Sequence, residues 1–305
     1  MTSKAVSYSS SKVRIVAPYP LTRRMTVKGE SEGIQLSGYL YSRFPYLSEE
    51  VWKERIRKGW IRINGDVAEA EHILRANQQI DHYNPHIVEP AVPDEVRVVS
   101  ETDDYLIAAK PAPMPMHQGG RYCKNTLISI LEEGGSGKLR MIHRLDSVTG
   151  GLVILAKNKD FALKLHHAFS SNRVKKWYYA LVDGISDTNK TEITVPIRRK
   201  AGFVFECGEN LEGGKPSHTI IEVIQRFDNK MLVRCEPVSG RTHQIRLHLR
   251  HWGHPIIDDP IYGPGGDDSG KRLQHCSIHL QSSYLAIPDL NIEAELDVPE
   301  DWIRV

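Results

Sequence analysis

A short cluster of charged residues stands just before a glycine turn in the middle of the chain. His143, Arg144 and Asp146 fall within four positions, and a Gly-Gly pair at 150–151 follows. The apolar run at 152–156 predicts a buried strand directly after the turn. A carboxylate beside potential cations, held where a turn enters such a strand, could act as a nucleophile or a general base. Asp146 is therefore the first candidate catalytic residue.

The elements expected around this turn mix strands with helices. Apolar spacing predicts helices over 160–169 and 242–252, and Asp228-Asn229 predicts a hairpin turn. Strand patterns cover 96–99, 105–109, 177–182, 193–197, 219–224 and 231–235. Because the helices do not alternate regularly with the strands, we predict an α+β fold with a mixed, largely antiparallel sheet and flanking helices.

Residues 36–85 are predicted to form a small αβ module of their own. Ser48 can cap a helix that Gly59 ends, and a short strand then meets the hairpin dipeptide Asn64-Gly65. Pro85, Pro90 and Pro93 are spread along the segment that follows, which is typical of a linker. The expected organisation is a basic arm over 1–35, the module over 36–85, a linker over 86–95 and a larger domain over 96–305.

The charge of the chain is distributed unevenly. The formal net charge is only +2, so nucleic-acid binding cannot be argued from the total. Residues 1–28, however, hold six Lys or Arg residues and no acid, and such an arm could contact phosphates. It could equally be a disordered terminus, or an organelle transit peptide, although Pro18 and Pro20 limit the amphipathic helix that such a peptide needs.

Several kinds of site are disfavoured by spacing. The four cysteines form no close pair, so we expect reduced thiols and neither a zinc ribbon nor a redox motif. The histidines of 243–254 lack a nearby Cys or acid to complete a metal site, so no metal is expected. The loop at 265–271 resembles a phosphate loop, but Arg272 replaces the required Ser or Thr, so no nucleotide cofactor is expected. His-Arg-Leu-Asp at 143–146 is one residue too long for a kinase catalytic loop.

Three separated segments, taken together, resemble one known family. His143-Arg144-Leu145-Asp146 with Thr149 and Gly151, then Lys176 to Val182, then Gly240-Arg241-Thr242-His243-Gln244-Ile245-Arg246 are similar to the motifs of the RluA family of pseudouridine synthases. Lys110-Pro111 upstream also fits, and Asp258 stands where the family has a glycine. The resemblance covers about residues 95–290. The module at 36–85 resembles, in a degenerate form, the alpha-L RNA-binding module of ribosomal proteins.

This resemblance implies an enzyme, an isomerase that converts uridine to pseudouridine in RNA bound in a central cleft. Asp146 would be the catalytic carboxylate, Arg246 would keep it ionised, and Tyr178 would stack on the base. Arg144 would fill the space left by the flipped base. The RNA-binding set that the resemblance implies is Arg144, His143, Arg241, Lys176 and Thr149. Taken singly, each candidate has an ordinary explanation: Asp146 as a turn residue, Tyr178 as core and Arg246 as a helix-surface charge.

The resemblance also implies the partners. We expect large-subunit ribosomal RNA as the substrate, because family members with an N-terminal module commonly act there, with transfer RNA as the alternative. A non-catalytic RNA-binding or RNA-folding protein on the same scaffold is the rival from another class. No cofactor is required. With no apolar run long enough for a membrane span, we expect a cytoplasmic protein without membrane contact, and a monomer.

Overall fold

The computed structural model describes residues 12–267 and 276–303. The chain forms two compact units: Val16–Glu89 is one, and Pro90–Val305 with the segment before Val16 is the other. Part of the expected basic arm, and residues 268–271 of the glycine-rich loop, lie outside the described residues. No helix among the described residues is long and apolar enough to cross a membrane.

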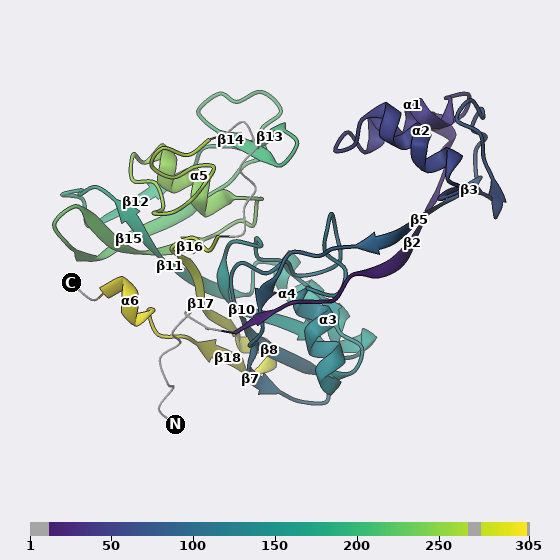
Figure 1. Cartoon of the computed structure of the whole chain (residues 1–305). Helices are drawn as coiled ribbons and strands as arrows, with labels where there is room; N and C mark the ends of the chain where they lie inside the picture. Colours follow the sequence, from purple (N-terminus) through teal and green to yellow (C-terminus); the bar gives the residue numbers. More distant parts are fainter. Residues whose placement is uncertain (1–11, 268–275, 304–305) are drawn as a thin grey trace. The chain divides into compact units, whose positions relative to one another are not determined.

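The smaller unit is a four-stranded sheet with two helices (Figure 1). The sheet order is β2-β5-β3-β4, and the elements are β2 (Tyr19–Thr26), α1 (Leu36–Arg43), α2 (Glu49–Arg57), β3 (Ile61–Ile63), β4 (Asp66–Val67) and β5 (Gln79–Ile87), with a short 3-10 turn at Gly29–Ser31. Ser48 caps α2 as expected, because its hydroxyl accepts a hydrogen bond from the backbone N–H of Val51. Strand β2 pairs with β5, so residues 19–26 belong to this unit and not to a separate arm.

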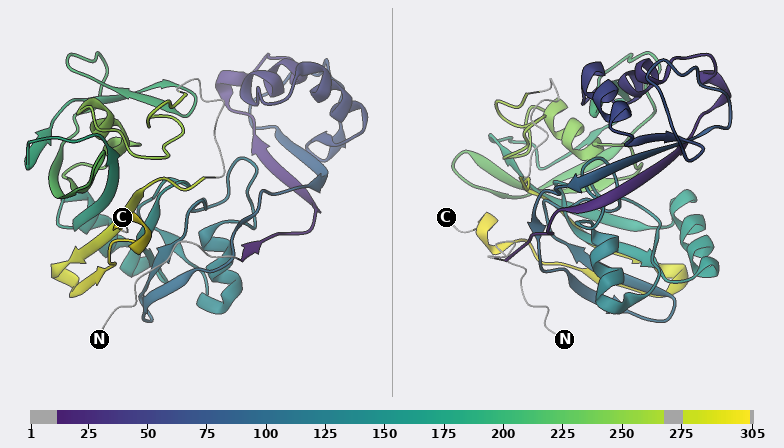
Figure 2. Two further views of the ribbon diagram at one scale, coloured as in Figure 1. Left: turned by 60° about the vertical axis from the view of Figure 1, so that its left-hand side comes forward. Right: turned by 45° about the vertical axis from the view of Figure 1, so that its right-hand side comes forward.

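The larger unit is built on a ten-stranded sheet (Figures 1 and 2). Its main path is β12-β15-β16-β11-β17-β10-β8-β7. In that order the strands are Lys190–Ile193, Thr219–Arg226, Lys230–Pro237, Lys175–Asp183, Leu280–Ile287, Gly150–Ala156, Tyr105–Lys110 and Arg97–Glu101. Strand β9 (Arg140–Met141) pairs with β10, and β18 (Ile292–Glu295) pairs with β17. The α+β prediction, with a largely antiparallel sheet, is confirmed.

Two further strand pairs and several helices complete this unit. Strands β1 (Val13–Arg14) and β6 (Val92–Pro93) pair, and β13 (Ile197–Ala201) and β14 (Val204–Cys207) form a hairpin. The helices are α3 (Leu127–Leu131), α4 (Lys159–Ser170), α5 (Gln244–His251) and α6 (Glu300–Ile303), with single turns at Glu132–Ser136 and Pro288–Leu290. The strand expected over 193–197 is wrong: β12 ends at Ile193 and β13 begins at Ile197, across Pro196, which has no N–H for a ladder.

Helices cover both faces of the sheet. Alternate side chains of β8 point to opposite faces, so Ile107 packs with α4 on one face and Leu106 packs with α3 on the other. Helix α5 packs its Ile245 over β11 and β16. Tyr178 of β11 contacts both the α3 cluster and the α5 cluster, so these two helices share a face and Tyr178 lies between them.

Candidate active site

The turn that carries Asp146 is fixed by a buried lysine. The ammonium group of Lys110 is fully buried and donates hydrogen bonds to the carbonyl oxygens of Ser147 (3.3 Å), Met114 (2.7 Å) and Pro111 (3.1 Å). The N–H of Met114 also donates to the Ser147 carbonyl at 2.8 Å. Burial lowers the pKa of Lys110 to about 7, although the negative charge of Asp146 opposes this. The turn is thus held rigidly against the end of β8.

A glycine brings this turn close to the next strand. Strands β10 and β17 are parallel neighbours, and Gly151 lies opposite Ser282. Gly151 has a φ of +109°, and a Cβ placed on it would stand 2.2 Å from the carbonyl oxygen of Ser282. Only glycine fits this position without displacing backbone. This contact sets where β10 begins, and Asp146 lies a few residues before that point.

Arg246 of α5 joins Asp146 to a second carboxylate. Its Nη1 donates to Oδ2 of Asp146 at 3.0 Å, while Nε and Nη2 donate to the two oxygens of Asp259 at 2.6 and 2.8 Å. The Asp259 side chain is fully buried, and its Oδ1 also accepts the backbone N–H groups of Ile261 and Tyr262. Asp259 therefore holds the guanidinium from two sides and presents Nη1 to Asp146.

Asp146 is ionised at neutral pH. Burial raises the pKa of its carboxyl, but His243, Arg246 with its hydrogen bond, and Lys110 outweigh burial and hold the pKa below its usual value. The side chain is still 25% exposed, so a ligand can reach it. Nη1 of Arg246 and Nε2 of His243 both approach Oδ2 of Asp146, the histidine nitrogen at 3.7 Å. An accessible, ionised carboxylate whose Oδ1 accepts no hydrogen bond from the described residues suits a nucleophile or a base.

Tyr178 is the third candidate catalytic residue. It is half-buried on β11, where it pairs with Cys235 of β16 and with Ser282 of β17. Burial raises the pKa of its phenol to about 12; a hydrogen bond with the Ser282 side chain opposes this and the charge of Asp146 adds to it. The phenol is therefore protonated at neutral pH. The structure brings Tyr178, Asp146 and Arg246 to one region of the larger unit, although they are far apart in the sequence.

His143 is not the cation that the sequence pattern suggested. Its Nε2 accepts the backbone N–H of Ile154 at 3.1 Å, and its ring stacks on Phe169 with 4.8 Å between centroids. Burial, and then the charge of Lys176, lower its pKa to about 3, so the ring is neutral. These contacts hold the segment before Asp146 against β10 and α4. Its contact with RNA stays a prediction.

The other four residues that were expected to contact RNA differ in their exposure to solvent. Arg144 and Arg241 are exposed, and Nε of Arg241 donates to the carbonyl of Pro216 at 2.9 Å. Lys176 is half-buried, and burial lowers its pKa. Thr149 is only 2% exposed, and its backbone N–H donates to the Asp146 carbonyl at 3.1 Å. Thr149 therefore closes the turn and offers RNA no surface in this conformation.

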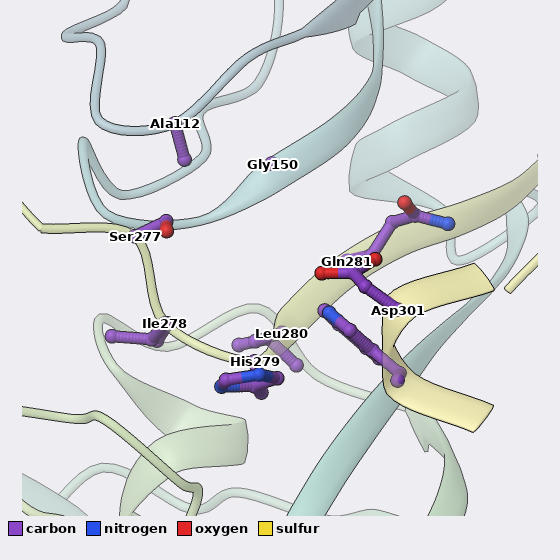
Figure 3. A pocket seen from close by; sticks show the side chains of 9 residues that line it. Ala112, Gly150, Ser277, Ile278, His279, Leu280, Gln281 and Asp301 are labelled. Atoms are coloured by element: carbon purple, nitrogen blue, oxygen red, sulfur yellow. The ribbon is translucent and has the colours of Figure 1, made fainter. Parts of the chain in front are cut away.

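A separate pocket of about 130 Å³ opens beside the start of β10 (Figure 3). Residues from the start of β17 and from α6 line it, among them Gln281 and Asp301. Asp146, Tyr178 and Arg246 are not among its lining residues. The carboxylate and this pocket are therefore different features of the larger unit.

Comparisons with known proteins point to RNA pseudouridine synthases. A family model described as RNA pseudouridylate synthase matches residues 104–251, which include all three candidate catalytic residues. RNA pseudouridine synthase 7 of Arabidopsis thaliana is 33% identical over 216 residues, which is 68% of this chain and 55% of that protein. The ribosomal large subunit pseudouridine synthase C of Escherichia coli is 25% identical over 304 residues, 92% of this chain and 94% of that protein.

The chain is similar to the RluA family of RNA pseudouridine synthases. The tRNA pseudouridine(32) synthase, mitochondrial, of Saccharomyces cerevisiae is 30% identical over 86% of this chain and 58% of that protein. The solved structure of human RNA Pseudouridylate Synthase Domain Containing 1 matches with a TM-score of 0.59 and 28% identity, over 70% of this chain and 87% of that one. The chain spans little more than half the length of the plant and yeast relatives.

Two residues that hold this site together have no sequence signal that predicts such a role. No sequence motif marks Asp259 as a partner of Arg246, and Lys110 stands out only as part of the Lys110-Pro111 dipeptide. An acid 13 positions after Arg246 gives no sign that it will clamp the guanidinium, because the chain must first turn back after α5. Asp258, where the family has a glycine, has a left-handed φ of 62°, which explains why glycine is favoured there.

Proposed function

We propose that this chain isomerises uridine to pseudouridine in RNA, with Asp146 as the catalytic residue. The observation that carries the proposal is the ionised, partly exposed carboxylate of Asp146, held by a buried arginine that a second carboxylate fixes. The reaction detaches the base at its glycosidic bond, turns it, and rejoins it to the ribose through ring carbon 5. Asp146 acts at the ribose, as the nucleophile that adds to it or as the base that removes its proton.

The neighbouring side chains divide the remaining work. Arg246 keeps Asp146 charged, since its own pKa is raised: burial alone would lower it, but the hydrogen bonds and charges of Asp259 and Asp146 outweigh burial. The Tyr178 ring stacks on the uracil, and its hydroxyl group takes part in removing the ring proton. Arg144 is exposed close to this region and takes the place of the flipped base in the RNA stack. Flipping costs a few kcal/mol, so a replacement contact lowers that cost.

We propose large-subunit ribosomal RNA as the substrate, with transfer RNA as the alternative. The Escherichia coli relative that aligns with nearly the whole chain is named for the ribosomal large subunit, whereas the yeast relative is named for tRNA. The small unit at 16–89 has the Ser48-capped helix and the Asn64-Gly65 hairpin on which its resemblance to the alpha-L module rests, and this resemblance supports an RNA-binding role for it. A monomeric, cytoplasmic protein stays part of the proposal.

The proposal is tested by mapping pseudouridine in ribosomal and transfer RNA fractions from cells with and without the gene. Wild type should restore any lost positions, and Asp146→Asn should not. The fraction in which positions disappear identifies the substrate class. Loss of no position in any RNA would refute the enzyme proposal, and restoration by Asp146→Asn would favour an RNA-binding or RNA-folding protein instead.

A matched control variant is available in the same unit. Asp183→Asn removes a carboxylate at the end of β11 that is exposed and that lies away from the Asp146 cluster. It should restore modification like wild type. Because the two variants make the same chemical change, a difference between them reports the position of the carboxylate and not the loss of one charge.

A further inference from the structure

His243 lies beside the catalytic carboxylate in an unusual backbone conformation. It stands at the N-terminus of α5 with φ 56° and ψ 20°, in the left-handed region that non-glycine residues rarely adopt. Its side chain makes no capping hydrogen bond, so helix capping does not explain a histidine here. Strain of this kind is kept where the side chain has a task. The contacts of the imidazole show what that task is.

A tyrosine determines which nitrogen of His243 carries the proton. Nδ1 of His243 lies 2.8 Å from the hydroxyl oxygen of Tyr262, and that oxygen accepts the backbone N–H of Phe205 at 2.9 Å. The Tyr262 proton therefore points to the one acceptor left within reach in the described contacts, Nδ1 of His243. Leaving this buried hydroxyl without an acceptor would be costly. The neutral imidazole then has its proton on Nε2.

The other nitrogen faces Asp146. Nε2 of His243 is 3.7 Å from Oδ2 of Asp146, the same oxygen that Arg246 binds at 3.0 Å. A proton on Nε2 attracts this carboxylate, whereas a lone pair there would repel it, so the second contact favours the same tautomer. Both groups approach Oδ2, and no described residue donates to Oδ1. Oδ1 is therefore the oxygen left for the substrate.

We propose that His243 is a positioning residue: as the neutral tautomer set by Tyr262, it directs its Nε2–H at Oδ2 of Asp146 and so keeps Oδ1 turned toward the ribose. This inference rests on the proposed function. The side chain of His243 is 12% exposed, and its pKa is lowered by burial. The charged and titratable groups that face it or its carboxylate from all packed elements are Asp146, Arg246, Asp259, Arg144, Tyr262 and Lys110.

The first test measures single-turnover rate constants against pH on an RNA that the enzyme modifies. His243→Leu removes the donor, whereas the amide of His243→Gln can place an N–H near the position of Nε2. We expect His243→Leu to slow the chemical step by about 10- to 100-fold and to move the acid limb to higher pH, with RNA binding changed less than about 2-fold. His243→Gln should recover much of the rate. An unchanged rate and pH profile in His243→Leu would overturn the proposal.

The second test examines the tautomer. Tyr262→Phe removes the proton that fixes it, and it should slow the wild-type enzyme but add no further loss in the His243→Gln background, because an amide has no tautomers. Equal slowing in both backgrounds would contradict tautomer selection. Tyr284→Phe, which removes a hydroxyl that donates to Glu293 on the protein surface, is the matched control. His251→Gln is the histidine control, exposed on the same helix.

A readout independent of activity separates this proposal from the proposed function. Nitrogen-15 chemical shifts of the His243 imidazole report which nitrogen carries the proton, even in a protein for which no RNA substrate is found. We expect protonated Nε2 in wild type and a mixture in Tyr262→Phe. A proton found on Nδ1 in the wild-type protein would overturn the inference and leave the proposed function untouched.

Discussion

Replacing Asp259 with asparagine tests whether Arg246 depends on its second carboxylate. The Asp259 side chain is fully buried and accepts four hydrogen bonds, two from Arg246 and two from the backbone N–H groups of Ile261 and Tyr262. Asparagine keeps the shape but offers one oxygen and one NH₂ group, so at least one of these donors would face another donor. Arg246, 3% exposed, would also lose a counter-charge. Breaking a buried ion pair from one side costs about 3–5 kcal/mol.

The loss should appear in urea unfolding followed by pulse proteolysis, which separates the two units of the chain by fragment size. We expect the larger unit to lose about 3–5 kcal/mol and the smaller unit to be unchanged. Glu222→Gln is the control: Glu222 pairs with Arg234 on the surface, both side chains being about two-fifths exposed, and its loss should cost less than about 1 kcal/mol. If Asp259→Asn costs no more than this control, Arg246 is held by other means and the reasoning fails.

Three further predictions concern other parts of the larger unit. Gly151→Ala should destabilise it by about 3 kcal/mol or more in the same assay, since a Cβ there meets the Ser282 backbone; Gly208→Ala, with open space around it, should be nearly neutral. Burial lowers the pKa of His248 to about 4, so the unfolded chain takes up a proton near pH 6.5 while the native protein does not. This group alone should lower the unfolding free energy by about 2 kcal/mol from pH 7 to pH 5, and His248→Asn should lessen the measured slope by that amount. Tyr178→Phe should keep RNA affinity within a few-fold but slow single turnover, because the ring remains and the hydroxyl is lost; an unchanged rate would exclude the phenol from the chemistry.

The fold class could be predicted from the sequence. Apolar residue patterns predicted six strands of the ten-stranded sheet, namely β7, β8, β10, β11, β15 and β16. Local signals such as Ser48 and Asn64-Gly65 marked element ends that the structure confirms. The strand expected across Pro196 was wrong, because hydrophobic spacing alone ignores the missing N–H. Pairing order was beyond reach: strand β17 inserts between β10 and β11, and nothing local in 280–287 specifies those neighbours.

The site could be predicted only in part for a related reason. The motifs drew attention to Asp146 and Arg246, which the structure places 3.0 Å apart. The charge of His143 could not be read from its type, because burial against Phe169 keeps the ring neutral. The hydrogen bond between Tyr262 and His243 also forms only in a fold in which the chain turns back after α5. Side-chain type gives possible chemistry, whereas protonation depends on tertiary contacts.

The position of β17 has a consequence for the order in which the larger unit is completed during synthesis. A ribosome that has released residues up to about 260 has already exposed Asp146, Tyr178 and Arg246. The strand that separates β10 from β11, residues 280–287, is not yet available, so the two halves of the sheet have no shared neighbour. Because this pairing joins segments distant in the chain, it forms late. A growing chain thus carries Asp146, Tyr178 and Arg246 before the sheet that positions them is complete.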